Sequence, residues 1–211
     1  VQQKRRLIIL TTHLQEDDPI VAFCKEAQVE CFRGDPLDVL DRFFQAAQKT
    51  SAKYILRSTA DCPLIDPDWI DVGINSFLSL DPTPDYLSNT LERTFPRGLD
   101  FEIFPRTALE KAWKNAKEPW EREHVTPYIY RHQELFQLQN IAHTPSLAHH
   151  RWTVDTEEDF ALITHILEAL YPKKPRFRLQ DIVDLLEKHP DWSQLNAHVE
   201  QKEFTIRKLN L

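Results

Sequence analysis

The sequence predicts an α/β protein whose mostly parallel central sheet is covered by helices. Short apolar runs of strand length alternate with stretches in which apolar residues recur at spacings of three and four. Prolines stand where helices should begin, and the loops between the elements are short. Strand–helix–strand repetition of this kind is typical of parallel sheets, because neighbouring parallel strands need a crossover connection that is usually a helix.

The first three strands and the first three helices alternate along the chain. Short apolar runs predict strands at residues 7–10, 29–32 and 54–56. One-sided apolar spacing predicts helices that begin near residues 17, 37 and 67. The first of these helices has an aspartate as its expected cap and Pro19 in its first turn, where the missing N–H costs nothing.

The second half of the chain is less regular. We predict two short extended pieces between residues 85 and 104, helices over 106–117, 121–133, 157–171 and 179–189, and strands over 136–141 and 151–154. The helix that follows Thr156 begins with a sequence typical of a capping box. The last twenty residues are polar and are predicted to be extended.

Composition limits the classes of function. The 33 acidic and 26 basic residues give a net charge of −7, whereas nucleic-acid binders normally carry a basic face. No apolar stretch is long enough for a membrane span. The 3 cysteines lack metal-type spacing and are expected to be reduced thiols, so we expect a cytoplasmic protein. With only 3 glycines there is no glycine-rich phosphate loop, which disfavours Rossmann dehydrogenases and P-loop enzymes.

Two aspartates occupy positions suited to a metal site. Asp61 follows the strand predicted at residues 54–56, and Asp155 follows the strand predicted at 151–154. Ligands of open α/β sheets bind outside the carboxyl ends of the strands, where a carboxylate can hold a hard cation beside phosphate oxygens. The alternative, about equally weighted, is that Asp61 caps the turn before Pro63 and that Asp155 marks a helix entry. The spacing alone does not show that the two residues meet.

Other polar residues are weaker candidates. In the stretch that contains Arg97, Asp100 and Glu102, the two carboxylates would project to the same side of a strand, and the alternative is a solvated strand face. His124 lies among charged residues, where a lone histidine is more often a surface or capping residue than a catalyst.

Motifs along nearly the whole chain resemble one family. The matching motifs, in order, are Asp17-Asp18-Pro19-Ile20, Phe32-Arg33-Gly34, Asp38-Val39-Leu40-Asp41-Arg42, Asp61-Cys62-Pro63-Leu64-Ile65-Asp66-Pro67, Ser88-Asn89-Thr90-Leu91, Pro96-Arg97-Gly98-Leu99-Asp100, Glu123-His124-Val125-Thr126-Pro127-Tyr128 and Arg151-Trp152-Thr153-Val154-Asp155-Thr156. The sequence thereby resembles the spore-coat polysaccharide biosynthesis branch of the cytidylyltransferases. Relatives of this branch make CMP-activated sialic-type acids and CMP-activated octulosonic acid.

The resemblance implies a three-layer α/β/α fold of the nucleotide-diphospho-sugar transferase type. It implies transfer of CMP from CTP to a sugar, expected to be acidic, with release of pyrophosphate, for surface polysaccharide biosynthesis in a homodimeric enzyme. The residue roles that it implies are catalysis and Mg²⁺ binding for Asp61 and Asp155, nucleotide binding for Arg33 and Thr59, and sugar binding for Arg97, Asp100, Glu102 and His124.

Two departures from the family pattern leave an alternative open. Ala60 stands where the family usually has glycine, and the family's opening strand with its Arg-x-x-Ser-x-Arg-x-Pro-Gly-Lys phosphate loop is absent. We therefore expect residues 1–211 to form a single cytidylyltransferase-like domain that lacks this strand and loop. The alternative is a non-catalytic relative that binds a nucleotide or a sugar. An enzyme that uses a preformed nucleotide-sugar is a third, weaker possibility.

Overall fold

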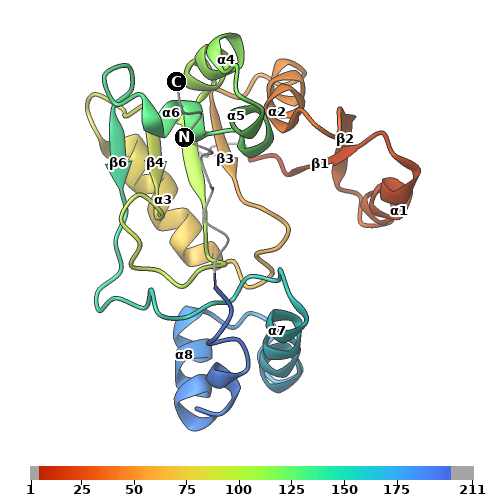
Figure 1. Cartoon of the computed structure of the whole chain (residues 1–211), viewed down its shortest axis with the longest axis vertical. Helices are drawn as coiled ribbons and strands as arrows, with labels where there is room; N and C mark the ends of the chain where they lie inside the picture. The colour runs from red at the N-terminus through yellow and green to blue at the C-terminus, as the bar shows by residue number, and fades with distance from the viewer. Residues whose placement is uncertain (1–4, 201–211) are drawn as a thin grey trace, which may run out of the picture. The chain divides into compact units, whose positions relative to one another are not determined.

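The structure is a computed structural model that describes residues 5–200 (Figure 1). Its contacts divide the chain into two compact units, each built from separate segments of sequence. Unit 1 comprises Val1–Arg57, Asn75–Ser88 and Glu102–Gln139, and unit 2 comprises Ser58–Ile74, Asn89–Phe101 and Asn140–Leu211. From the sequence we expect residues 1–211 to form a single domain. In the structure, the chain passes back and forth between two compact units.

Unit 1 holds most of the β-structure. Strands β1 (Ile8–Thr12) and β2 (Glu30–Gly34) form a parallel pair in which Leu10 lies opposite Phe32. A separate four-stranded sheet has the order β3–β5–β4–β6. The bounds of its strands are Tyr54–Arg57 for β3, Tyr86–Ser88 for β4, Glu102–Pro105 for β5 and Leu138–Asn140 for β6.

The α/β class is confirmed, but the strand directions in the larger sheet differ from the mostly parallel arrangement that we expected. Strand β5 runs antiparallel to both of its neighbours, β3 and β4. The reason lies in the connection: the chain passes from β4 to β5 through a loop without a helix, whereas parallel neighbours need a crossover. Among the strand pairs of the described residues whose register is known, the β1–β2 pair is the parallel one.

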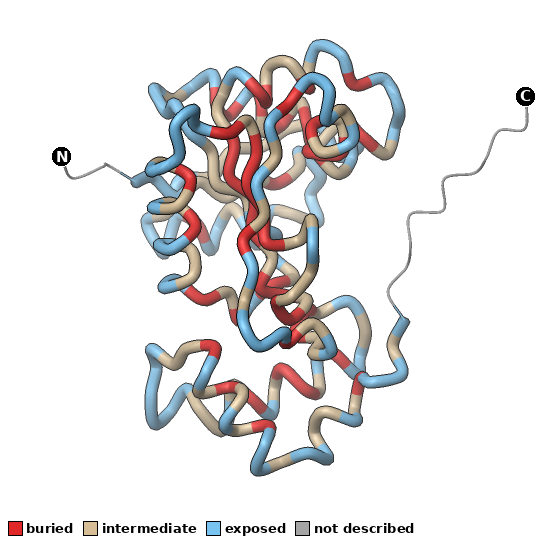
Figure 2. Tube along the Cα trace, turned by 90° about the vertical axis from the view of Figure 1, so that its left-hand side faces the viewer, coloured by how far each residue is buried: buried red, intermediate tan, exposed pale blue. Residues whose placement is uncertain are grey.

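The helices of unit 1 include α1 (Asp18–Glu26), α2 (Val39–Gln48), α4 (Arg106–Asn115), α5 (Pro119–His124) and α6 (Pro127–Arg131). The Asp38 carboxylate caps α2 by accepting the backbone N–H of Asp41 at 2.8 Å. Stacking of Phe44 on Trp113, with ring centroids 4.0 Å apart, joins α2 to α4. Figure 2 shows buried residues concentrated along the central strands, and Tyr86, Leu87 and Phe104 are fully buried there.

Two local predictions need correction. Asp17 does not cap α1 with its side chain; its carboxylate accepts hydrogen bonds from Thr11 and Thr12 at the end of β1, and these bonds lower its pKa to about 2. The single helix predicted over 121–133 is two short helices. Buried Val125 has φ 74° between them, and Pro127, which restricts the residue before it, begins the second.

Unit 2 consists of loops packed against helices. It contains α7 (Glu157–Leu170), α8 (Leu179–Lys188), the short 3₁₀ helix η2 (Trp192–Gln194) and the first part of α3 (Pro67–Ser79). The strand predicted over 151–154 is reduced to an isolated parallel bridge between Arg151 and Arg97, because the N–H of Trp152 bonds to Arg97 whereas that of Val154 bonds to Asp61 in another segment. The residues predicted to be extended at the end of the chain include η2, and those beyond residue 200 lie outside the described residues.

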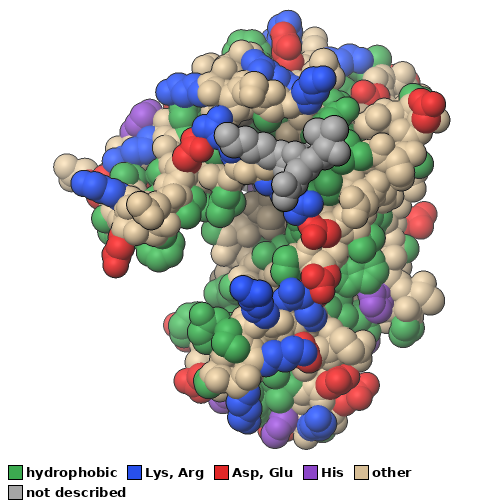
Figure 3. All heavy atoms as spheres, turned by 180° about the vertical axis from the view of Figure 1, so that it is seen from behind, with side chains coloured by type: hydrophobic (Ala, Val, Ile, Leu, Met, Phe, Trp, Pro, Cys, Tyr) green, Lys and Arg blue, Asp and Glu red, His purple; other side chains and the backbone are tan. Residues whose placement is uncertain are grey.

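Acidic and basic side chains are interspersed over the face drawn in Figure 3. The net charge of −7 is therefore not displayed on this face as a field of one sign. Within residues 5–200, no helix is long and apolar enough to cross a membrane.

Candidate active site

Three loop segments meet in unit 2, and each of them carries residues predicted to act at the site. The backbone N–H of Val154 donates to the carbonyl of Asp61 at 2.9 Å, and the Thr153 hydroxyl donates to the same carbonyl at 3.0 Å. The Arg97 N–H donates to the carbonyl of His150 at 3.1 Å, and the Arg97 carbonyl accepts the N–H of Trp152 at 2.6 Å. The structure thus brings the segments of Asp61 and Asp155 together, which the spacing could not show.

Gly98 allows the backbone of its own segment to lie close to the backbone of Trp152 and Thr153. Its φ of +101° lies in the left-handed region that favours glycine. A Cβ at this position would lie 2.4 Å from the backbone nitrogen of Thr153 and 2.4 Å from the carbonyl carbon of Trp152. Only a residue without a side chain fits here, which explains the glycine in the Arg97–Asp100 motif.

The Asp61 carboxylate is half-buried and is held by its own loop. It accepts a hydrogen bond from the Thr59 hydroxyl, and the Cys62 thiol lies 3.6 Å from the same oxygen. Burial raises the pKa of Cys62 to about 12, so the thiol keeps its proton at neutral pH. The turn before Pro63 is closed by the backbone bond from Cys62 N–H to the Thr59 carbonyl, 3.2 Å, rather than by the Asp61 side chain.

Asp155 presents its carboxylate at the surface, with 43% of the side chain exposed. One oxygen, Oδ2, accepts a hydrogen bond from the Arg151 guanidinium at 2.7 Å. The cap of α7 is Thr156, whose hydroxyl accepts the N–H of Asp159 at 3.2 Å in the predicted capping box. The side chain of Asp155 therefore does not serve as the cap of the helix that follows it.

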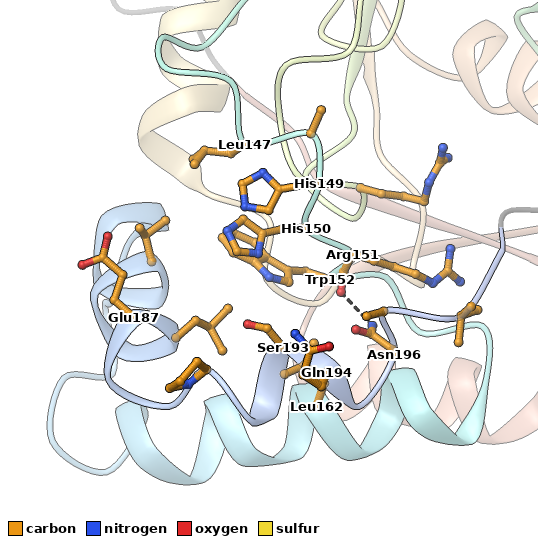
Figure 4. Close-up of a pocket in the computed structure, with 17 residues that line it drawn as sticks. Leu147, His149, His150, Arg151, Trp152, Leu162, Glu187, Ser193, Gln194 and Asn196 are labelled. Carbon is orange, nitrogen blue, oxygen red and sulfur yellow. Dashed lines mark hydrogen bonds between the residues drawn. The ribbon is translucent and has the colours of Figure 1, made fainter.

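No site role was predicted from the sequence for the three residues that surround Asp155 in the structure, which are Arg151, Asp159 and Asn196. Arg151 bonds through Nε and Nη2 to both oxygens of the fully buried Asp159, at 2.9 and 2.7 Å. Asn196 donates to Asp159 at 2.7 Å and to the Arg151 carbonyl at 2.9 Å (Figure 4). Burial opposes ionisation of Asp159, yet the hydrogen bonds from Arg151 and Asn196 lower its pKa. The capping box was the one signal that pointed to Asp159.

Arg97 and Asp100 flank Gly98 and differ in their partners. Asp100 accepts two hydrogen bonds from Arg93, at 2.7 and 2.8 Å. Arg97 is half-buried, and within residues 5–200 its guanidinium forms no hydrogen bond or ion pair. Burial, and then the neighbouring Arg93, lower the pKa of Arg97 below the ordinary value of an arginine. A desolvated guanidinium without a partner is suited to an anionic group of a ligand.

Arg97 and Arg151 also line a cavity of about 630 Å³ in unit 2. Figure 4 shows the rings of His149 and His150 at this cavity, with the Arg151 side chain extending away from them. Partial burial, and the adjacent His149, lower the pKa of His150 to about 4, so the half-buried ring is neutral at physiological pH. The remaining lining mixes apolar residues, among them Leu162 of α7 and Leu186 of α8, with polar residues such as Ser193 and Gln194 of η2.

The other predicted residues belong to unit 1. Glu102 is not on a solvated strand face: it is buried in β5 and accepts hydrogen bonds from Arg57, from the Tyr86 hydroxyl at 2.6 Å and from the Thr126 hydroxyl. Its burial is possible because Arg57, directly opposite in β3, neutralises the carboxylate.

Arg33 and His124 also have local roles in unit 1. Arg33 donates to the carbonyls of Thr12 and Leu14, each at 2.6 Å, and to Asp18 at 2.7 Å, so it fastens the segment between β1 and α1. His124 ends α5 and is half-buried; burial lowers its pKa from 6.5, although Glu123 acts in the opposite direction.

The Asp61 and Asp155 side chains are of the chemical type that Mg²⁺ binds together with substrate phosphates. No group of three or more metal-binding side chains occurs in the described part of the chain. Mg²⁺ does not require such a group, because it is usually bound by one or two carboxylates together with substrate phosphates and water. Asp61 and Asp155 would be the two carboxylates of such a set, and their loops are joined by the backbone bond from Val154 to the Asp61 carbonyl.

Comparisons with known proteins agree with one another. A family profile described as cytidylyltransferase matches residues 1–204. An uncharacterized protein of Methanocaldococcus jannaschii is 38% identical over 94% of this chain and 79% of its own length. The spore coat polysaccharide biosynthesis protein SpsF of Bacillus subtilis is 30% identical over 90% of this chain and 78% of its own length.

Two solved structures are similar as well. A cytidylyltransferase from Leptospira borgpetersenii has a TM-score of 0.84 and 32% identity, covering 89% of this chain and 78% of that one. A CMP:2-keto-3-deoxy-manno-octonic acid synthetase complexed with CTP has a TM-score of 0.55 and 13% identity, covering 80% of this chain and 83% of that one. The second likeness is one of fold, and together the two confirm the nucleotide-sugar transferase type of α/β fold.

Proposed function

This chain belongs to the cytidylyltransferase family, and from that premise we propose that it transfers CMP from CTP to a hydroxyl group of a sugar. A sugar oxygen forms a bond to the α-phosphorus of CTP, the bond to the β-phosphate breaks, and pyrophosphate leaves. The name of the Bacillus subtilis relative favours a sugar of a surface polysaccharide. An acidic sugar and a homodimeric enzyme are parts of the same proposal.

One observation carries the proposal further than family membership does. The loop of Asp61 and the loop of Asp155 are joined by hydrogen bonds from Val154 and Thr153 to the Asp61 carbonyl. Two carboxylates held on adjoining backbone segments are suited to a cation that also binds phosphate. The joined backbones support a shared role for two residues that were candidates independently.

Asp61 and Asp155 would hold Mg²⁺ in this proposal. When bound, the ion supplies neutralisation of charge on the α-phosphate and a lower pKa for the attacking hydroxyl. The chain's own contribution is placement: Thr59 orients Asp61, and Arg151 orients Asp155. Arg97 is available for an anionic group, either a phosphate of CTP or the carboxylate of an acidic sugar.

Calorimetric titration with CTP in the presence of Mg²⁺ tests the proposal, with ATP as the competing nucleotide. We expect binding that prefers CTP, requires the metal, and is lost in Asp61→Asn and Asp155→Asn. Asp191→Asn is a matched control, because Asp191 is an exposed aspartate of unit 2 whose side chain caps nothing. Binding of equal strength in all four proteins, or no preference for CTP, would contradict the proposal.

Pyrophosphate release separates the enzyme from a binding protein. The chain is incubated with CTP, Mg²⁺ and a panel of sugars that includes 2-keto-3-deoxy acids and neutral sugars, and pyrophosphate is measured. Release that depends on one class of sugar identifies the acceptor. CTP binding without release with any sugar would instead support the non-catalytic relative.

A further inference from the structure

The contacts around Asp155 go beyond what is needed to begin a helix. The capping box of α7 needs Thr156 and Asp159 only, and both of its hydrogen bonds are present. Arg151 and Asn196 also converge on Asp159, which is fully buried and accepts hydrogen bonds from both. A buried carboxylate paired with arginine is costly to build, and a hydrophobic pair would often be at least as stable.

Asp159 holds Asp155 in two ways at once. Its Oδ2 atom accepts the backbone N–H of Asp155 at 3.1 Å, which fixes the main chain. Arg151, seated on both oxygens of Asp159, directs the same Nη2 group to Oδ2 of Asp155 at 2.7 Å, which fixes the side chain. Within residues 5–200 the other oxygen of Asp155, Oδ1, has no hydrogen-bond partner, and the side chain is 43% exposed.

Asn196 completes the arrangement from a distant part of the chain. Its amide bonds both to Asp159 and to the carbonyl of Arg151, so that the arginine is fixed at its main chain and at its guanidinium. Asn196 is itself buried, with 3% exposure. Figure 4 shows its amide directed at the Arg151 carbonyl.

We propose that Arg151, Asp159 and Asn196 are positioning residues that hold the Asp155 carboxylate with one oxygen directed outward for a metal–nucleotide complex. The inference rests on the proposed function, because it assumes that Asp155 meets the metal. Groups behind a metal-binding carboxylate orient it, and their loss commonly weakens metal binding by about 10-fold to 100-fold.

The chain supplies a matched control for the capping role. Asp181 occupies in α8 the place that Asp159 has in α7: it is the third residue of a capping box and accepts the N–H of the cap residue, Arg178, at 2.8 Å. It also accepts a hydrogen bond from exposed Lys174, at 2.8 Å. Asp181→Asn therefore alters a capping box of unit 2 without altering the contacts of Asp155.

The test measures binding of Mn²⁺, a paramagnetic substitute for Mg²⁺, by electron paramagnetic resonance in the presence of CTP. We expect the affinity for Mn²⁺ to fall about 10-fold in Asp159→Asn and in Arg151→Lys. Lysine lacks the planar guanidinium group that bonds to both Asp155 and Asp159. Asp181→Asn should bind as the wild type does.

The possible failures are distinguishable. Loss of Mn²⁺ binding in Asp155→Asn with wild-type binding in Arg151→Lys and Asp159→Asn overturns the positioning role and leaves the proposed function intact. Wild-type binding in Asp155→Asn, or no metal-dependent binding by the wild type, overturns both. An equal loss in Asp181→Asn shows a capping effect and overturns the positioning role. If Asp159→Asn does not fold, the Mn²⁺ affinities of Arg151→Lys and Asn196→Ala are compared with that of the wild type instead.

Discussion

Glu102 shows how a residue selected for chemistry can instead belong to the interior. Its carboxylate is held by Arg57 on the neighbouring strand and by the hydroxyls of Tyr86 and Thr126. Burial, and then the charge of Glu102, raise the pKa of Tyr86 well above its ordinary value, so the phenol donates its proton to this bond at all physiological pH values.

Glu102→Gln should lower the free energy of unfolding by about 3 kcal/mol, because it leaves the Arg57 cation in a site with little solvent. Urea denaturation measures the change. Glu110→Gln is the control: it removes the exposed pair with Lys114 and should lower the free energy of unfolding much less than Glu102→Gln does. Equal losses in the two variants would show that the Arg57–Glu102 pair contributes no more than a surface pair.

His150 gives a second prediction at the scale of one residue. Its pKa in the folded protein is about 4, because of burial and then of His149, whereas the ordinary value is 6.5. Between these two pH values the unfolded chain therefore binds more protons than the folded protein. The contribution of the neutral ring to the free energy of unfolding is thus fully present above pH 6.5 and is lost as the pH falls toward 4.

His150→Asn should reduce the loss of stability on acidification from about pH 7 to about pH 4.5, measured by urea denaturation at each pH. His13→Asn, at an exposed histidine of unit 1, is the control and should leave the pH dependence closer to that of the wild type. An unchanged pH dependence in His150→Asn would mean that acid unfolding proceeds without protonation of this ring.

Candidate site residues could be predicted from the sequence more readily than the residues to which they are hydrogen-bonded. Asp61 and Asp155 were both selected because each follows a predicted strand, yet only the bonds to the Asp61 carbonyl join their segments. Those bonds link positions far apart in the chain, and no local pattern encodes them. For the same reason Arg151 and Asn196 were not selected, since their partner Asp159 was identified only as part of a cap.

At the scale of the elements, local signals predicted most helices and strands. Pro67 begins α3, and the helices predicted over 106–117 and 179–189 correspond to α4 and α8 within a few residues. The antiparallel direction of β5 was missed, although no helix was predicted between the two extended pieces of residues 85–104 and parallel neighbours need a crossover connection. The break at Val125 was missed although Pro127 is the kind of residue that ends a helix.

The capping box of α7 gives a prediction at this scale. Thr156→Ala removes the acceptor for the N–H of Asp159 and should lower the free energy of unfolding by about 1 kcal/mol. Thr164→Ala in the same helix is the control; its hydroxyl bonds back to the Phe160 carbonyl, an interaction that adds little to a helix, and alanine is the better helix former. If the two variants lose stability equally in urea, the box does not stabilise α7.

At the scale of the whole molecule, neither unit is continuous in sequence. Unit 2 draws on three segments, and its longest segment depends on the other two. The N–H of Leu179 at the start of α8 bonds to Asp66, at 2.7 Å. Trp69 and Phe95 pack against His143 with ring centroids 5.3 and 5.5 Å away. The longest segment alone therefore lacks partners for buried polar groups and rings.

We therefore expect a fragment of residues 140–211 to have no cooperative unfolding transition, although it contains both α7 and α8. Far-ultraviolet circular dichroism should show partial helix that melts gradually, since isolated helices of this length are marginal in water. Near-ultraviolet signals from tryptophan, strong in the full chain where Trp152 is fully buried, should be weak in the fragment. A sharp transition with a native-like tryptophan signal would show that the segments carrying Asp61 and Arg97 are additions to a self-sufficient helical core. The positions of the loops that carry Asp61 and Asp155 would then have to be explained without the interleaving of the chain.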